Sequence, residues 1–211
     1  MNNHRCIFAA SGVLLLLALT ACTPKGARLL LEPSQVLGSV LAEETVRAAG
    51  SKKEVVLIVP KWAANSAAGE SFKAALRKQG FNIAFTLVVD VGDPMSRDLI
   101  GLKSADFFSA LEKTASAGVV VSLAGAPLLN DQDAARLGSE HPPVLAVATS
   151  SLGEVMGIPS NRPYLAGLLK AKIIQLAIVD AEPEPVAPLS EKLEASQQLF
   201  AQHYRILRHS D

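Results

Sequence analysis

Polar and aromatic residues follow several predicted strands, and their types suit the binding of a small ligand. Trp62, the only tryptophan, offers a ring for stacking, and Lys61 beside it can donate hydrogen bonds. A helix that begins at Asn65 or Ser66 would present backbone amides to an anion. The candidate ligand-binding residues are Lys61, Trp62, Asn65, Ser66, Asp90, Ser122, Gly125, Thr149 and Ser150.

The residues that follow the first predicted strand have structural alternatives. Trp62 could cover the edge of a sheet, or it could pack against a helix predicted over residues 33–49. Asn65 and Ser66 are residue types that cap helices, so they could serve that purpose alone.

The later candidates also have structural alternatives. Asp90 lies close to Asp93-Pro94, which is an ordinary turn signal, so Asp90 and Asp93 could shape a turn rather than contact a ligand or a cation. The small side chains of residues 122–127 suit close approach of a ligand, but they equally suit tight packing. Residues 149–151 could simply cap the turn that follows them.

Motifs that mark common catalytic and nucleotide-binding sites are missing from the sequence. There is no G-x-G-x-x-G after the first predicted strand, no G-x-x-x-x-G-K-[ST] loop and no G-x-S-x-G elbow. His141 precedes two prolines and has no evident carboxylate partner. We therefore expect a protein that is not an enzyme and that uses no cofactor and no metal.

The first residues form a leader with an apolar run over residues 7–21 behind Arg5. This run is shorter than the roughly 20 apolar residues that span a bilayer, and its layout is that of a secretory signal peptide. Leu19-Thr20-Ala21-Cys22 resembles the bacterial lipobox, which implies cleavage after Ala21 and acylation of Cys22. We expect a protein held on a bilayer by lipidated Cys22. Thr23 follows where an aspartate would imply inner-membrane retention in the lipoproteins that this leader resembles, so the resemblance favours the outer membrane.

The charge balance bears on nucleic acid as a partner, and the cysteine content bears on disulfide formation. The chain has 20 basic and 20 acidic residues, so nothing favours nucleic acid as a partner. Its only cysteines are Cys6, in the predicted leader, and Cys22, so a disulfide is not expected in the mature monomer.

Apolar strand runs alternate with amphipathic helices from residue 54 onward, a pattern typical of parallel βαβ units. We expect an α/β fold: a Rossmann-like three-layer sandwich with a five-stranded parallel sheet in the order 2-1-3-4-5, and helices at both termini. The expected strands are residues 55–59, 82–89, 118–123, 143–148 and 173–179, and the expected helices are 33–49, 66–79, 104–115, 128–137, 163–171 and 189–204. The predicted domains are a signal peptide (1–21), a tether with a short helix (22–53), a lobe (54–180) and a Pro-rich link with a last helix (181–211).

Several segments of the predicted lobe share a pattern with one protein family. They are Ile58-Val59-Pro60, Asn65 with Gly69 and Phe72, Gly80-Phe81-Asn82, the Gly92-Asp93-Pro94 turn, residues 118–122, residues 143–147 and the N-x-x-x-x-A-G-x-L helix of residues 161–169. Together they resemble one lobe of the type I periplasmic binding proteins, which are receptors for sugars and amino acids related to LacI-type repressor cores. That resemblance implies a ligand site at the carboxyl ends of the strands, where the strand order reverses.

The sequence departs from this family in ways that bear on function. Ser66-Ala67-Ala68 follows Asn65 where the family places aromatic residues, and Thr149-Ser150 stands where many sugar binders have Asp-Arg. Too few residues follow Asp180 for a second lobe, so either two chains pair or the lobe has another use. We expect a lipid-anchored, periplasm-facing lobe that binds a small polar ligand in solute binding or sensing. The alternative is a cell-envelope scaffold that docks a partner protein.

Overall fold

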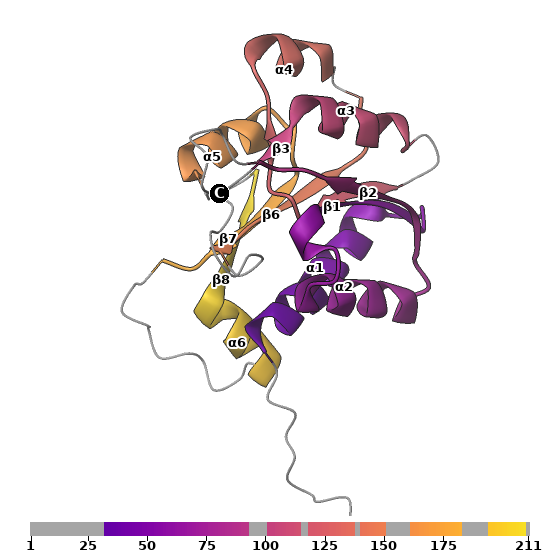
Figure 1. Cartoon of the computed structure of the whole chain (residues 1–211). Helices are drawn as coiled ribbons and strands as arrows, with labels where there is room; N and C mark the ends of the chain where they lie inside the picture. The colour runs from indigo at the N-terminus through magenta and orange to yellow at the C-terminus, as the bar shows by residue number, and fades with distance from the viewer. Residues whose placement is uncertain are drawn as a thin grey trace, which may run out of the picture. The chain divides into compact units, whose positions relative to one another are not determined.

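Apolar runs rich in valine form a six-stranded sheet whose strands are joined mainly through helices (Figure 1). The sheet order is β2-β1-β4-β6-β7-β8. Its strands are β1 (Glu54–Pro60), β2 (Asn82–Val89), β4 (Val119–Ser122), β6 (Val144–Ala148), β7 (Leu176–Asp180) and β8 (Tyr204–Arg208). The first five are parallel, and β8 pairs antiparallel with β7. The fold is therefore α/β with a mostly parallel central sheet.

The computed structural model describes residues 32–92, 101–114, 118–137, 140–150, 161–182 and 194–209. These residues belong to one compact unit, Leu31–Asp211. The leader, Cys22, Asp93-Pro94 and most of the Pro-rich link lie outside the described residues. None of the described helices is long and apolar enough to cross a membrane.

The predicted 2-1-3-4-5 order of the parallel strands is confirmed, but the count of five strands is wrong. Residues 204–208, predicted partly as the end of a helix and partly as a polar tail, form β8 at the edge of the sheet. Helix α6 (Ala195–His203) ends because Tyr204 has extended backbone angles, φ −136° and ψ 158°. A second, two-stranded sheet pairs β3 (Leu102–Lys103) with β5 (Pro127–Leu128).

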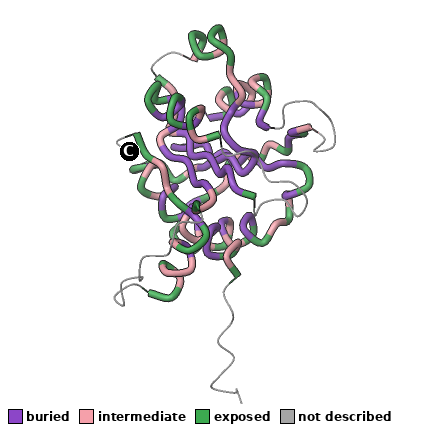
Figure 2. Tube along the Cα trace, turned by 90° about the vertical axis from the view of Figure 1, so that its left-hand side faces the viewer, coloured by how far each residue is buried: buried purple, intermediate pink, exposed green. Residues whose placement is uncertain are grey.

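Alternate residues of the strands feed two apolar cores, one on each face of the sheet. Val55 and Leu57 of β1 join the core covered by α1 (Pro33–Ala49), α2 (Ala67–Lys78) and α6. Val56 and Ile58 join the opposite core, which is covered by α3 (Ser104–Glu112) and α5 (Arg162–Lys170). Figure 2 shows the buried strands at the centre. This three-layer arrangement confirms the predicted sandwich.

Helix α1 lies directly against α2. A Cβ atom added at Gly38 would come within 2.2 Å of the Ala68 carbonyl oxygen, so only glycine permits this backbone approach. Leu37 and Leu41 of α1 are fully buried in the core that also contains Val55 and Leu57 of β1. Helix α1, predicted as a short helix beside the tether, is thus part of the packed fold.

Two helices differ in their bounds from those predicted. The helix predicted over residues 104–115 begins at Ser104 with Lys103 at its N-cap, but it ends at Glu112. The helix predicted from residue 128 begins at Asp131 as α4 (Asp131–Leu137), because Pro127 and Leu128 are used as strand β5. Helix α4 has no buried residues.

Candidate functional site

The strand order reverses between β1 and β4, and three exposed predicted residues follow β1 there. A single 3-10 turn, η1 (Lys61–Ala63), carries Lys61 and Trp62 out of the sheet, and Ala63 is buried beneath them. Trp62 is 45% exposed, and Lys61 and Asn65 are exposed as well. We call Lys61, Trp62 and Asn65 the rim residues. An indole face, an ammonium and an amide are therefore accessible at the position where open parallel sheets bind ligands.

Ser66 stands at the N-cap of α2. Its Oγ accepts a hydrogen bond from the Gly69 backbone N–H at 3.1 Å. This bond satisfies one of the amides that a helix start leaves unpaired. The Ser66 hydroxyl is thus engaged within the helix start.

Ser122 and Gly125 form a closed turn after β4. The Ser122 hydroxyl donates to the Gly125 carbonyl oxygen at 2.7 Å, and its oxygen accepts from the Ala124 N–H at 3.2 Å. Gly125 has φ +85°, a conformation that favours glycine. Ser122 is fully buried. Its hydroxyl therefore stabilises the turn.

The other predicted residues lie at the ends of β2 and β6. Asp90 is exposed, and its Oδ1 accepts from the Gly92 N–H at 3.1 Å. Thr149 is fully buried, whereas Ser150 is exposed and donates its backbone N–H to Asp180 Oδ2 at 2.7 Å. The structure places these residues at the carboxyl ends of the strands, where Asp90 bonds to neighbouring backbone and Ser150 bonds to the Asp180 side chain.

The contacts of Arg162 with Asp180 and Glu182 at the end of β7 were not predicted from the sequence. Arg162 Nη1 lies 3.2 Å from Glu182 Oε1, and Arg162 Nη2 donates to the Asp180 carbonyl oxygen at 3.1 Å. The sequence signal for these contacts was Asp180, which directly follows an apolar strand run. The predicted strand ended at residue 179, one residue before it. These side chains hold the start of α5 against the end of β7.

Tyr164, also missed, connects α5 to the loop after β4. Its hydroxyl donates to the Pro127 carbonyl oxygen at 2.7 Å and accepts from the Leu129 N–H at 2.9 Å. Only long-range packing brings these groups together, so the sequence carries no local signal for them.

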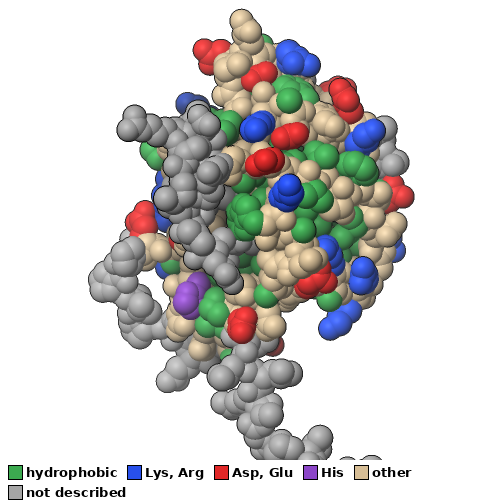
Figure 3. All heavy atoms as spheres, in the orientation of Figure 1, with side chains coloured by type: hydrophobic (Ala, Val, Ile, Leu, Met, Phe, Trp, Pro, Cys, Tyr) green, Lys and Arg blue, Asp and Glu red, His purple; other side chains and the backbone are tan. Residues whose placement is uncertain are grey.

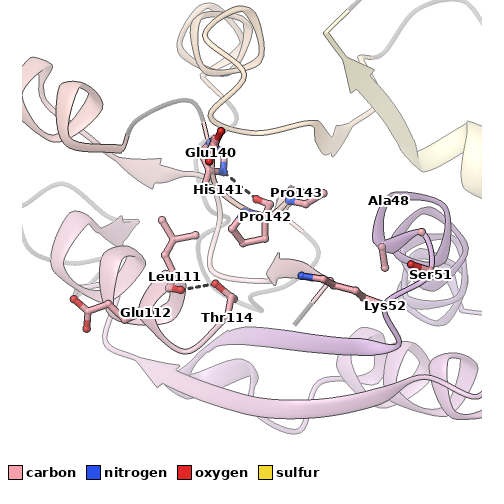
Figure 4. Close-up of a pocket in the computed structure, with 13 residues that line it drawn as sticks. Ala48, Ser51, Lys52, Leu111, Glu112, Thr114, Glu140, His141, Pro142 and Pro143 are labelled. Atoms are coloured by element: carbon pink, nitrogen blue, oxygen red, sulfur yellow. Dashed lines mark hydrogen bonds between the residues drawn. The ribbon is translucent and has the colours of Figure 1, made fainter. Parts of the chain in front are cut away.

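A hollow of about 730 Å³ lies at the opposite, amino-terminal ends of the strands (Figure 4). Lys52 extends from the loop after α1 toward Thr114 and Pro142, whereas Glu112 points away. His141 Nδ1 lies 2.9 Å from the Pro142 carbonyl oxygen. The hollow is lined by residues 48–52, Leu111, Glu112, Thr114, Gly118 and residues 140–143. Sequence reasoning did not anticipate a hollow there.

The described residues offer no metal site, since no three His, Cys, Asp or Glu side chains among them are placed to hold an ion. Every buried side-chain nitrogen or oxygen in the part of the chain that the structure describes has a hydrogen-bond partner. Basic and acidic side chains are interspersed over the face seen in Figure 3. At the rim, the Trp62 ring can stack on a ligand, and Lys61 and Asn65 can form hydrogen bonds with it.

No protein-family model matches the sequence, and no curated protein matches it. Among solved structures, the chain is similar to an ABC transporter solute-binding protein from Burkholderia graminis in complex with D-arabinose. That match has 18% identity and a TM-score of 0.48, and it covers 69% of this chain and 47% of that one. It is also similar to a periplasmic ribose ABC transporter from Conexibacter woesei, with 14% identity, a TM-score of 0.43, and coverage of 69% and 45%.

The chain spans less than half the length of these solved proteins. The names of these two proteins describe solute binding and transport.

Proposed function

We propose that this chain is a membrane-anchored, non-catalytic lobe that binds a small polar ligand at its rim residues, in solute binding or sensing. The observation that carries the proposal is the joint exposure of Lys61, Trp62 and Asn65 where the strand order reverses. The deeper groups, Ser122 and Thr149, are fully buried, so the rim makes the first contacts.

The rim chemistry suits a ligand with one apolar face and several hydroxyl or amide groups. The Trp62 ring can cover the apolar face, as aromatic rings do in ligand sites. The Lys61 ammonium supplies up to three donors, and the Asn65 amide supplies both donors and an acceptor. A monosaccharide, an amino acid or a nucleoside fits this description.

Attachment to the membrane rests on Cys22. Two or more acyl chains hold a protein stably where a single chain does so only transiently. An N-terminal lipid would keep the lobe at the periplasmic side of the envelope, with the outer membrane favoured. Replacing Cys22 with Ser should abolish incorporation of a labelled palmitate analogue and move the protein out of the membrane fraction, whereas Cys6→Ser should retain labelling. Labelling that persists in Cys22→Ser contradicts the anchor.

Ligand binding can be tested by a thermal-shift screen of the full chain with sugars, amino acids and nucleosides, followed by calorimetry on any hit. We expect Trp62→Ala to weaken binding about fivefold or more, since stacking on an aromatic ring contributes on the order of 1 kcal/mol or more. Trp62→Phe, which keeps a ring, should lose less.

Two lysine variants give a matched control. Lys61→Ala should weaken the same ligand, whereas Lys78→Ala should not, because exposed Lys78 lies at the far end of α2. A screen in which no compound shifts the melting temperature would count against the proposal, and so would equal effects of the two lysine variants.

A second candidate function is docking of an envelope protein. It is favoured by the internal bonds of Ser66, Ser122 and Asp90, which leave fewer polar groups for a small ligand. It is favoured also by the exposed indole of Trp62, because aromatic residues are enriched in protein interfaces. Crosslinking in native membranes should then recover a stable partner that Trp62→Ala loses. Recovery of no partner would contradict this function.

A further inference from the structure

Basic side chains gather at the amino-terminal end of the sheet, opposite the rim residues. In parallel units each helix ends where the next strand begins, so helix ends and strand starts share one end of the fold. Lys52 and Lys53 precede β1, and Lys53 Nζ lies 4.0 Å from where a Cβ atom of Gly80, after α2, would stand. We call seven exposed cations at this end of the fold the basic end: Lys52, Lys53, Arg77, Lys78, Lys113, Lys170 and Lys172.

The charge of the basic end is not neutralised by its neighbours. None of the seven cations forms an ion pair with another described residue. Arg47 and Arg208, which lie at the same end, are balanced by Glu43 and Glu44, with which they pair. Three further acidic residues of the described chain stand there without an ion pair: Glu54, Glu112 and Glu140. Seven cations against three carboxylates leave this end positive.

Helix dipoles account for only part of this charge. A cation in the last turn of a helix is stabilised by the partial negative charge there, and the effect falls off beyond that turn. Arg77, Lys78 and Lys170 lie in such last turns. Lys52, Lys53 and Lys172 lie beyond the helix ends, so the dipoles do not explain them. A surface with this excess of positive charge attracts negatively charged partners.

The opposite end of the sheet differs in both charge and apolar content. Four acidic residues stand there against Lys61 and Lys103, one after β2 and three in the first turns of α3 and α4: Asp90, Asp106, Asp131 and Asp133. The two large apolar side chains that are exposed in the described chain, Trp62 and Val88, also lie at this end. The lobe therefore has a basic end that is polar and an opposite end that is acidic and partly apolar.

We propose that the basic end docks on the anionic headgroups of the bilayer that holds the lipid anchor. Each cation near an anionic membrane surface strengthens binding about fivefold. A protein partner fits this end less well, because lysine is depleted in protein interfaces and their energetic centres are large buried anchors such as tryptophan and tyrosine. The inference rests on the proposed anchor at Cys22, but not on ligand binding by the rim.

This docking fixes the orientation of the rim residues. Strand β1 has seven residues and spans about 23 Å between the basic end and the rim. The rim would therefore face away from the bilayer and stay open to soluble ligands. The acidic residues beside it would be held away from the anionic headgroups.

Quenching of tryptophan fluorescence by nitroxide-labelled headgroups measures this orientation, because Trp62 is the only tryptophan. The lipidated chain is reconstituted in vesicles of phosphatidylcholine with or without phosphatidylglycerol. A second protein carries Ser51→Trp and Trp62→Phe, which places the only indole beside Lys52. On vesicles with phosphatidylglycerol we expect strong quenching at position 51 and little at position 62. High salt should remove the quenching at position 51, because it screens exposed charges.

Two single lysine variants, made in the Ser51→Trp/Trp62→Phe protein, form a matched pair. Lys52→Glu should lower the ratio of docked to undocked chain about fivefold or more, since it removes one of the seven cations. Lys103→Glu makes the same change at an exposed position of the opposite end and should leave the quenching unchanged. Equal melting temperatures establish that both variants fold.

The outcomes separate the docking from the anchor. A chain that phosphatidylcholine vesicles do not retain shows that the anchor fails, and such a chain overturns the docking as well if vesicles with phosphatidylglycerol do not bind it. For a retained chain, equal quenching at positions 51 and 62, or equal quenching on the two kinds of vesicle, overturns the docking. So does an equal effect of the two lysine variants. An acidic protein that crosslinks to the basic end, with no quenching on vesicles, assigns this surface to a protein partner instead.

Discussion

The two edges of the sheet are finished in different ways. At one edge, β8 follows α6 and covers β7, and its Arg208 Nη2 lies 2.8 Å from Oε2 of Glu44 in α1. The other edge, β2, has no charged residue, and its residues alternate between exposed and partly buried until Val89. The contrast is that one outer strand carries Arg205 and Arg208 and is tied to α1, whereas the other is uncharged and has no partner among the described residues on its outer side.

The largest expected effect comes from removing the ring that fixes the β8 edge. Tyr204 is 2% exposed, and its ring centre lies 5.4 Å from that of Phe200. Tyr204→Ala should lower the free energy of unfolding by about 3 kcal/mol, because it leaves a large cavity in the core. Urea denaturation measures this. Tyr204→Phe, which keeps the ring, should lose much less, and equal losses in the two variants would show that packing is not the cause.

A smaller effect is expected from Glu44, which pairs with Arg208 of β8 and with Arg47 of its own helix α1. The Glu44 side chain is 7% exposed and contacts both Arg47 and Arg208, whose side chains are 64% and 44% exposed. Glu44→Gln should cost about 1–2 kcal/mol, less than a fully buried pair because both arginines remain solvated. Glu43→Gln is the control, since its 3.8 Å contact with Arg47 is on the surface and should contribute under about 0.5 kcal/mol. A cost for Glu43→Gln as large as that for Glu44→Gln would contradict the distinction.

The smallest effect is expected at the other edge. Val88→Ala should change the free energy of unfolding of the monomer by less than about 0.5 kcal/mol, because the side chain is largely exposed. Urea denaturation checks this. A loss comparable to that of Tyr204→Ala would mean that the two edges are closed alike.

The parallel part of the fold could be predicted because each strand has a local signal. Residues 55–59 form an apolar run of the kind buried on both faces, and similar runs mark β4, β6 and β7. Strand β8 could not be identified in this way. Its residues follow directly after a helical segment, with no turn signal between them. It forms a strand because it pairs with β7, which lies far from it in the sequence.

The candidate site was predictable in position but not in detail. Because parallel strands end at one edge of a sheet, Trp62 and Ser122 could be assigned to the same edge from sequence alone. The Ser122 bonds to Gly125 and Ala124 depend on the turn's backbone geometry. The Tyr164 contact with Pro127 depends on how α5 packs, which no local pattern specifies.

The contact between α1 and α6 has a consequence for the order of folding. The first and last helices of the described chain pack together, and Phe200 of α6 shares a core with Leu37 of α1. Contacts of such long sequence separation form late and slow folding, because the chain loses entropy before they stabilise it. The core between α1 and the sheet thus stays incomplete during synthesis until α6 and β8 have emerged.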